Sequence, residues 1–412
     1  MNQSKINKRK IINDPVYGFI SIPNSLVFDI IEHPFFQRLR RIKQLGLTHL
    51  VYPGALHTRF QHAIGAMHLM CNAIDVLRYK GLDISPEEEE ASVIAILLHD
   101  IGHGPFSHSL ENSIVDNITH EVISEFFMTA LNKHFQNKMS LAIKIYKNTY
   151  NKKFLHQLVS SQLDMDRLDY LNRDSYFTGV SEGVIGSERI IKMLNVQNDE
   201  LVVDAKGVYS IEKFVLARSL MYWQVYLHKT VVSAEYLLIH ILRRAKELVQ
   251  QGKEVFCTPA LGVFMKNTFN QKSFLKNNKT LEQFALLDDY DIYTSIKVWC
   301  NSSDNILSML SQRLINRQLF KIEYQNTPFN TDYINKIKEK TIKNTGIKDD
   351  EVQYFVYTDS ISNSIYSQSS DKIKILFKND MLLDITEASD QLDKEVLNKT
   401  IIKYFLCYPK DV

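Results

Sequence analysis

Apolar residues recur at helical spacing over the first three quarters of the chain. In several stretches they fall three and four residues apart, which is the pattern of a helix with a buried face. These stretches are Leu26–Leu47, Ala63–Leu77, Ala91–Leu98, Glu121–Leu131, Met139–Tyr146, Phe154–Tyr170, Ile211–Val249 and Leu281–Val298. Short connections separate them, and there is no internal repeat. The pattern therefore predicts an all-α array.

Two regions depart from this spacing. Turn residues followed by alternation predict a short hairpin between Asp14 and Ile22. Beyond Phe320, β-branched and aromatic runs flank one lysine-rich helical stretch, which predicts the order β-α-β-β-β. The segments are Phe320–Tyr324, the helical Tyr333–Lys343, Val352–Tyr357, Ile373–Phe377 and Leu382–Ile385, with a serine-rich loop over Asp359–Asp371. We expect a mainly α protein with a helical domain over residues 1–319. A small α+β domain over residues 320–412 would serve oligomer contacts or regulation.

Composition excludes several function classes. The 412 residues carry 49 Lys+Arg against 47 Asp+Glu, a formal net charge of +2. The overall charge therefore gives no sign of nucleic-acid or membrane binding, although a local basic cluster leaves nucleic-acid binding open. Four cysteines lie far apart without Cys-x-x-Cys spacing, which favours buried thiols in a reducing compartment. No run of about 18 apolar residues occurs, so we expect a cytoplasmic protein.

The densest chemistry lies between Leu97 and His108. His99 and Asp100 end an apolar helix that begins with the capping-box pair Ser85 and Glu88, and His103 and His108 follow closely. Adjacent helical residues point about 100° apart, so His99 and Asp100 can share an ion only if other elements complete the shell.

Two outlying segments offer the missing groups. Upstream, Arg59 and His62 stand one turn apart at the start of a helix. Downstream, Asp166, Tyr170 and Asp174 fall at i, i+4 and i+8, which places two carboxylates and a phenol on one helix face. Together these residues predict a metal site with a polar wall beside it.

These segments resemble the HD-domain phosphohydrolase superfamily, whose metal signature is a His, a His-Asp pair and a distant Asp. The resemblance assigns the metal ligands to His62, His99, Asp100 and Asp166, with the metal core at about residues 45–180 of an HD-domain helical array. Segments Asn13–Gly18, Gln37–Gly46, His57–His62 and His99–His108 are similar to the dNTP triphosphohydrolase branch. The resemblance runs from about Lys10 to Lys229. It implies that a dNTP and water yield deoxynucleoside and triphosphate, and that the protein is a homo-oligomer, a dimer or tetramer.

A mixed shell of imidazole and carboxylate suits Mn²⁺, Fe²⁺, Zn²⁺ or Ni²⁺ better than Mg²⁺. Mg²⁺ stays open as a companion of the triphosphate. An ion in that shell would act as a Lewis acid on a phosphate oxygen.

The resemblance also implies roles around the metal. His108 would protonate the leaving nucleoside oxygen, while His103 and His120 would contact the attacked phosphate. Glu111, where relatives carry Asp, would orient a histidine. Candidate cations for the triphosphate are Arg59, Arg167, Arg218 and Lys229.

Further residues would recognise the nucleoside. By resemblance, Gln44 and Asp174 contact the sugar 3′-hydroxyl, and Tyr170 reaches phosphate. Leu45 and Tyr226 would form an apolar wall that excludes a 2′-hydroxyl, with ordinary core packing as the alternative.

An activating guanine nucleotide is implied at a second place. Lys10, Asn13, Glu32 and Arg40 match the positions that bind it in animal relatives, with Glu32 in place of Asp. The neighbouring basic cluster admits other interpretations, namely a nucleotide, nucleic-acid or interface patch, or a solvated helix face. Its members are Arg38, Arg40, Arg41 and Lys43.

Two rival functions stay open. One is a phosphodiesterase or nucleotidase acting on another phosphate ester, because the same metal core serves such reactions. The other is a nucleotide or nucleic-acid binding module whose metal is structural.

Overall fold

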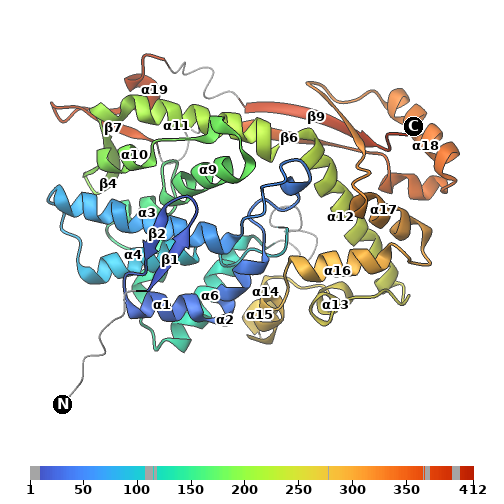
Figure 1. Ribbon diagram of the computed structural model, residues 1–412, viewed down its shortest axis with the longest axis horizontal. Coiled ribbons are helices and arrows are strands. Elements are labelled where there is room, and N and C mark those ends of the chain that lie inside the picture. The colour runs from blue at the N-terminus through green and yellow to red at the C-terminus, as the bar shows by residue number, and fades with distance from the viewer. Residues whose placement is uncertain are drawn as a thin grey trace.

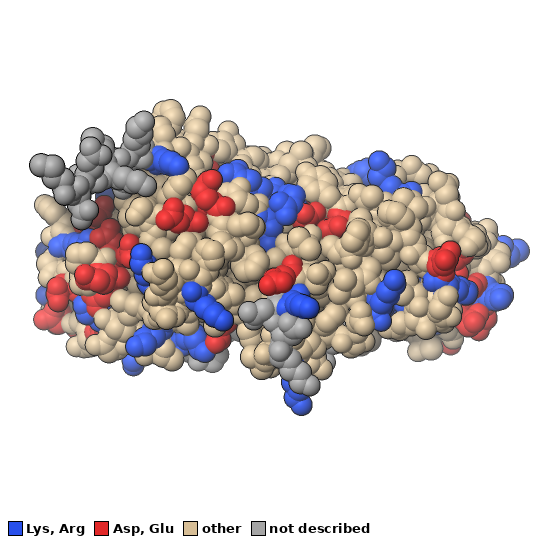
Figure 2. Space-filling model, turned by 90° about the horizontal axis from the view of Figure 1, so that it is seen from below, with Lys and Arg blue, Asp and Glu red and all other residues tan. Residues whose placement is uncertain are grey.

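The structure, a computed structural model, describes residues 10–106, 115, 118–276, 278–364, 366, 372–391 and 400–412. It is mainly α-helical with small sheets, as predicted. Helices α3, α4 and α9 lie in one half of an elongated molecule, and α16, α17 and α18 lie in the other (Figure 1). No helix of the described part is both long and apolar enough to span a bilayer. Basic and acidic side chains are interspersed over the face in Figure 2, in keeping with the balanced composition.

The predicted hairpin is confirmed as strands β1 (Ile11–Asp14) and β2 (Gly18–Ser21), which pair antiparallel. The helices that follow it build the first half of the protein. They are α1 (Ser25–Glu32), α2 (Pro34–Gln37), α3 (Arg59–Tyr79), α4 (Pro86–Leu98), α6 (His120–His134), α7 (Ser140–Tyr146), α8 (Lys153–Val159), α9 (Met165–Thr178) and α10 (Ser187–Met193).

Helix α4 is the centre of this half. Its capping box is formed as predicted, with Ser85 and Glu88 exchanging hydrogen bonds of 3.2 and 2.8 Å. Every residue from Ala91 to Leu98 is buried, and α3 and α7 pack against the helix. Because a helix that is apolar on all sides is enclosed by its neighbours, α4 delivers His99 and Asp100 to a fixed position.

Several long predicted helices are broken, and each break has a local cause. Residues 26–47 are interrupted at Pro34, because the residue before a proline is pushed to an extended conformation, here His33 at ψ 138°. The predicted helix over residues 154–170 is broken before Asp164, because this residue caps the N-terminus of a new helix, α9. In residues 281–298, Asp288 does the same for α16.

The second half has the same character. The predicted helix over residues 211–249 is α11 (Val208–Met221), a π-helical turn (Tyr222–Tyr226) and α12 (Lys229–Gln250). The helices after α12 are α13 (Pro259–Lys266), α14 (Gln271–Lys276), α15 (Asn278–Ala285), α16 (Asp289–Trp299) and α17 (Asn305–Ile315). Helix α17 packs on α12 and α16.

The C-terminal residues divide between two sheets. Strands β5 (Lys321–Gln325), β6 (Tyr357–Ser364) and β9 (Thr400–Tyr408) form an antiparallel sheet in the order β5-β9-β6, beside α18 (Thr331–Thr345). Strands β7 (Lys374–Leu376) and β8 (Leu382–Asp384) instead extend a hairpin of β3 (Leu194–Gln197) and β4 (Glu200–Asp204), with β7 parallel to β4. Helix α19 (Ile385–Ala388) follows.

The observed topology adds to the predicted β-α-β-β-β order and departs from it in places. Residues 320–412 do not build one sheet of their own, because β7 and β8 join the earlier hairpin. The predicted strand at residues 352–357 is a 3-10 turn, Asp349–Tyr354, and β6 occupies the start of the expected serine-rich loop. Strands β3, β4 and β9 were not predicted. The domain limit at residue 320 stays a prediction.

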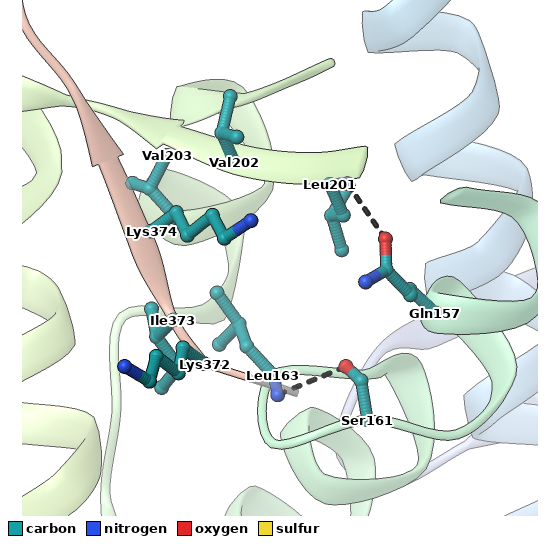
Figure 3. Close-up of a pocket in the computed structure, with 9 residues that line it drawn as sticks. All are labelled: Gln157, Ser161, Leu163, Leu201, Val202, Val203, Lys372, Ile373 and Lys374. Atoms are coloured by element: carbon teal, nitrogen blue, oxygen red, sulfur yellow. Dashed lines mark hydrogen bonds between the residues drawn. The ribbon is translucent and has the colours of Figure 1, made fainter. Parts of the chain in front are cut away.

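Figure 3 shows where β7 meets the first half of the protein. Leu163 and Ile373 lie beside β4, and Gln157 Oε1 accepts a hydrogen bond of 2.7 Å from the backbone N–H of Leu201. The cavity at this junction is about 20 Å³, which is room for a single water molecule. The junction is therefore packing and not a ligand site.

Candidate metal centre and substrate cavity

The four predicted metal ligands lie together although they come from three helices. His62 belongs to the first turn of α3, His99 and Asp100 follow α4, and Asp166 belongs to the first turn of α9. Asp166 Oδ1 is 3.0 Å from His62 Nε2 and 3.4 Å from His99 Nε2. Asp100 lies 3.4 Å from His99 Nε2 and 3.8 Å from His62 Nε2. His62, His99 and Asp166 are therefore close enough to hold one ion, and Asp100, which also pairs with Arg59, adjoins this group.

The hydrogen bonds made by the Nδ1 atoms of His62 and His99 are those expected of histidines that bind a metal through Nε2. His62 Nδ1 bonds Asp169 Oδ2 at 2.7 Å, and His99 Nδ1 bonds the carbonyl of Ile96 at 2.6 Å. Both partners are acceptors, so each Nδ1 carries a hydrogen, and each ring presents a lone pair at Nε2 once the proton there is displaced. Both Nε2 atoms are buried without a hydrogen bond. Buried nitrogens in this state are unusual unless an ion takes the free position.

The electrostatics of the cluster also favour a cation. Burial alone would raise the pKa of Asp166, but His99 and His62 hold it well below its usual value. Burial lowers the pKa of His62, yet Asp166 and Asp169 outweigh that effect and raise it to about 10. The carboxylates therefore require positive charge between them, from protons or from a metal ion that displaces them.

A second histidine pair adjoins Asp100. His103 Nε2 is 3.5 Å from Asp100 Oδ1, and the rings of His103 and His120 stack with centroids 3.8 Å apart. Burial and the charge of Arg59 hold the pKa of His103 well below its usual value. His103 is therefore neutral near pH 7. The predicted catalytic residues His108 and Glu111 lie outside the described residues.

Gly102 sets the path of the loop that carries His103. Its N–H donates to Ser124 Oγ at 2.9 Å, and that hydroxyl donates to the carbonyl of His99 at 2.8 Å. A Cβ at Gly102 would lie 2.2 Å from the carbonyl oxygen of His120 and 2.3 Å from the nitrogen of Ser124. The close approach of α6 therefore requires glycine here.

We expect Gly102→Ala to destabilise the fold by about 2–4 kcal/mol, because backbone atoms of α6 would have to move. Thermal unfolding should show the loss. Gly104→Ala is the matched control in the same loop, since its Cβ would meet only the ring of Phe284, at 3.3 Å. Equal stability of the two variants would contradict the role given to Gly102.

A cavity of about 460 Å³ opens beside the cluster, within the range of small-molecule sites. Most of the predicted substrate residues line it. The lining comprises Gln44, Leu45, Gly46, Thr48, Arg59, Asp100, His103, Phe106, His120, Asp166, Arg167, Tyr170, Asp174, Tyr222, Tyr226, Leu227 and Glu235. Arg218 and Lys229 are not among these residues, and Lys229 is exposed. The charge of Arg218 nevertheless acts to lower the pKa of the lining residue Tyr170, so the roles of these two cations stay predictions.

Asp174 lines the same cavity and stands about two turns along α9 from Asp166. His57 Nε2 bonds its Oδ1 at 2.8 Å, and the hydroxyl of Tyr226 donates to its Oδ2 at 2.8 Å. His57 stacks on Phe177, with the ring centroids 4.5 Å apart. Sequence analysis missed this role of His57, although the residue opens the motif that contains His62.

Comparison with known families decides the identity of this arrangement. The family described as HD domain matches residues 59–174, and the family described as HD associated region matches residues 185–255. The protein YwfO of Bacillus subtilis is 34% identical over 99% of this chain and 94% of its own length. The chain belongs to the HD-domain family.

Two further likenesses bear on chemistry. A phosphohydrolase of Bacteroides thetaiotaomicron, a solved structure, is 54% identical with a TM-score of 0.95, covering 98% of this chain and all of that one. The deoxynucleoside triphosphate triphosphohydrolase SAMHD1 homolog of Dictyostelium discoideum is 31% identical over 58% of this chain. The chain spans 50% of that relative. The family predicted from the sequence is thus confirmed.

Both matched regions contribute to the cavity lining. The HD domain supplies two of the four predicted ligands, Asp100 and Asp166, and the HD-associated region supplies Tyr222, Tyr226, Leu227 and Glu235. Glu235 on α12 was not predicted, because nothing near it in the sequence suggests chemistry. The π-helical turn brings Tyr226 to Asp174, which an uninterrupted helix over residues 211–249 was not expected to do.

The basic cluster of the HD-domain protein is mostly engaged in internal contacts. Arg38 is fully buried and donates to the carbonyls of Ile101 and His103, at 2.8 and 2.6 Å. Arg41 pairs with Asp288, and Lys43 lies 3.6 Å from Asp289. For Arg38, the interpretation as a solvated helix face or a free basic patch is therefore wrong.

The residues predicted to bind a regulatory nucleotide lie outside the cavity lining. Lys10, Asn13, Glu32 and Arg40 are all exposed. Burial lowers the pKa of Arg40 and the charge of Glu32 raises it, so these two side chains lie near each other. Their role stays a prediction.

Proposed function

We propose that this protein is a metal-dependent phosphohydrolase that splits a deoxynucleoside triphosphate into deoxynucleoside and triphosphate. The observation that carries the proposal is one cavity with two chemically different parts about 12 Å apart, the separation of Asp166 and Asp174 along α9. Asp100, His103, His120 and Asp166 line one end beside the histidine cluster, and Asp174 and Tyr226 line the other. A phosphate ester fits the first end and a sugar fits the second.

At the phosphate end, His62, His99, Asp100 and Asp166 would hold a divalent transition ion. When bound, such an ion would polarise a phosphate oxygen and promote deprotonation of water. His103 and His120 would hold oxygens of the α-phosphate, and His108 would protonate the departing 5′ oxygen. Arg59, Arg167 and Tyr170 line the same cavity and would bind the remaining phosphates.

At the sugar end, Asp174 would accept the 3′-hydroxyl. Gln44 Oε1 is buried without a hydrogen-bond partner and belongs to the cavity lining. A hydroxyl donor on the ligand would satisfy it. Leu45 and the ring of Tyr226 would form an apolar wall that excludes a 2′-hydroxyl, which favours deoxyribose.

The test is product analysis with a panel of dNTPs in H₂¹⁸O, using protein loaded with Mn²⁺ or Fe²⁺, with and without GTP. Attack at the α-phosphorus forms a new P–O bond and breaks the bond to the 5′ oxygen. We therefore expect ¹⁸O in triphosphate and none in the deoxynucleoside. Inorganic phosphate or a monophosphate as product would favour the rival phosphodiesterase or nucleotidase. Binding without turnover would favour a binding module.

GTP in the same panel tests the exposed site of Lys10, Asn13, Glu32 and Arg40. Light scattering on the same protein tests the expected homo-oligomer.

A further inference from the structure

A buried chain of hydrogen bonds runs from the N-terminal hairpin to the metal cluster. It begins at Asp14, the last residue of β1, and passes through Arg173 and Asp169 of α9 to His62. Arg173 and Asp169 are fully buried and Asp14 is 4% exposed. None of these three residues lines the cavity.

Each link is short. Arg173 Nη1 donates to Asp14 Oδ2 at 2.7 Å, and Arg173 Nε donates to Asp169 Oδ2 at 2.9 Å. A second contact joins Arg173 Nη2 to Asp169 Oδ1 at 3.0 Å. The same Asp169 Oδ2 receives the hydrogen bond from His62 Nδ1. One oxygen of Asp169 therefore serves both the guanidinium and the metal-facing imidazole.

The surroundings hold this chain in one arrangement. A Cβ at Gly65 of α3 would lie 2.0 Å from Asp169 Oδ1 and 2.2 Å from Arg173 Nη2, so α3 closes over the pair. Asp14 Oδ1 accepts from the N–H groups of Val16 and Tyr17 at 2.9 and 3.0 Å, which ties the carboxylate to the hairpin turn.

We propose that Asp14 is a positioning residue for the metal centre, acting through Arg173 and Asp169 to orient His62. Asp14 and Asp169 carry two negative charges against the one positive charge of Arg173. The surplus negative charge polarises the His62 ring and makes its Nε2 a stronger ligand for a cation. Without the Asp14 carboxylate, the charge of Arg173 acts on Asp169 alone and weakens the hydrogen bond that Asp169 accepts from His62 Nδ1.

This inference concerns the same metal centre as the proposed function, but its test needs no substrate. The full-length protein is stripped of metal with a chelator, and Co²⁺ affinity is measured by competition, with the visible absorption spectrum as a report on ligand geometry. We expect Asp169→Asn to weaken Co²⁺ binding about 10- to 100-fold and Asp14→Asn about fivefold, since Asp14 is one step further from the ion. Both spectra should change.

The matched control is Asp304→Asn. Asp304 also pairs with an arginine through both oxygens, to Arg244 at 3.0 and 2.6 Å, and it caps the N-terminus of α17 by accepting from Leu307 N–H. The Asp304→Asn substitution should leave the Co²⁺ affinity and the absorption spectrum unchanged. Arg173→Lys provides a second test if Asp14→Asn does not fold, because lysine keeps the charge but cannot bridge two carboxylates.

The double variant of Asp14→Asn with Asp169→Asn should bind Co²⁺ no more weakly than Asp169→Asn alone. Wild-type Co²⁺ affinity in Asp14→Asn would overturn the inference. If Asp14→Asn does not fold, wild-type Co²⁺ affinity in Arg173→Lys would overturn it. So would an equal loss in Asp304→Asn, or fully additive losses in the double variant. A wild-type protein that binds no Co²⁺ would overturn the metal centre itself.

Discussion

Replacing Asp166 by asparagine is expected to release the metal ion and abolish hydrolysis. Asp166 is the carboxylate that approaches both unpartnered imidazole nitrogens, at 3.0 and 3.4 Å. An amide of the same shape offers no charge to the ion. We expect kcat/KM to fall by about a thousandfold or more, since metal stabilisation of the transition state amounts to several kcal/mol. Metal content should fall with it.

The measurement pairs metal analysis of the purified protein with the product assay. Asp174→Asn is the matched control, because Asp174 stands on the same helix and in the same cavity but outside the cluster. It should keep its metal while losing activity on dNTPs. An Asp166→Asn protein with full metal content and unchanged turnover would contradict the assignment of Asp166 as a ligand.

The family and the approximate site followed from short motifs in the sequence. His62, His99, Asp100 and Asp166 are recognisable because few other roles bring such residue types to such spacings. The orienting residues were harder to find. Asp169 and Arg173 continue the polar stripe that begins at Asp166, at i+3 and i+7, and this is a signal that could have identified them.

Other features depend on contacts that local patterns do not contain. Strand β7 pairs with β4 far back in the chain, and neither strand has a long alternating pattern of its own. The partner of Asp169 and Arg173 is Asp14, on a hairpin at the opposite end of the domain sequence. Such pairings are decided by tertiary packing, so the sequence could predict strands at the C-terminus but not the sheet that each would join.

Replacing Asp174 by asparagine is expected to weaken recognition of the sugar. Asp174 is buried, and its two oxygens are held by His57 and Tyr226. In the proposed complex it accepts the 3′-hydroxyl, and loss of a hydrogen bond to a charged group typically costs about 1.5–3 kcal/mol. We therefore expect Asp174→Asn to lower kcat/KM for dTTP by about 10- to 150-fold.

The same variant should behave differently with 2′,3′-dideoxythymidine triphosphate, which has no 3′-hydroxyl to lose. With this substrate we expect little change in kcat/KM. In the variant, the ratio of kcat/KM for dTTP to kcat/KM for the dideoxy substrate should therefore approach one. Tyr226→Phe removes only the hydroxyl that holds Asp174 and should produce a smaller shift in the same direction. A loss of equal size for both substrates would mean that Asp174 supports the cavity without contacting the sugar. Only an effect that depends on the 3′-hydroxyl assigns this end of the cavity to the nucleoside.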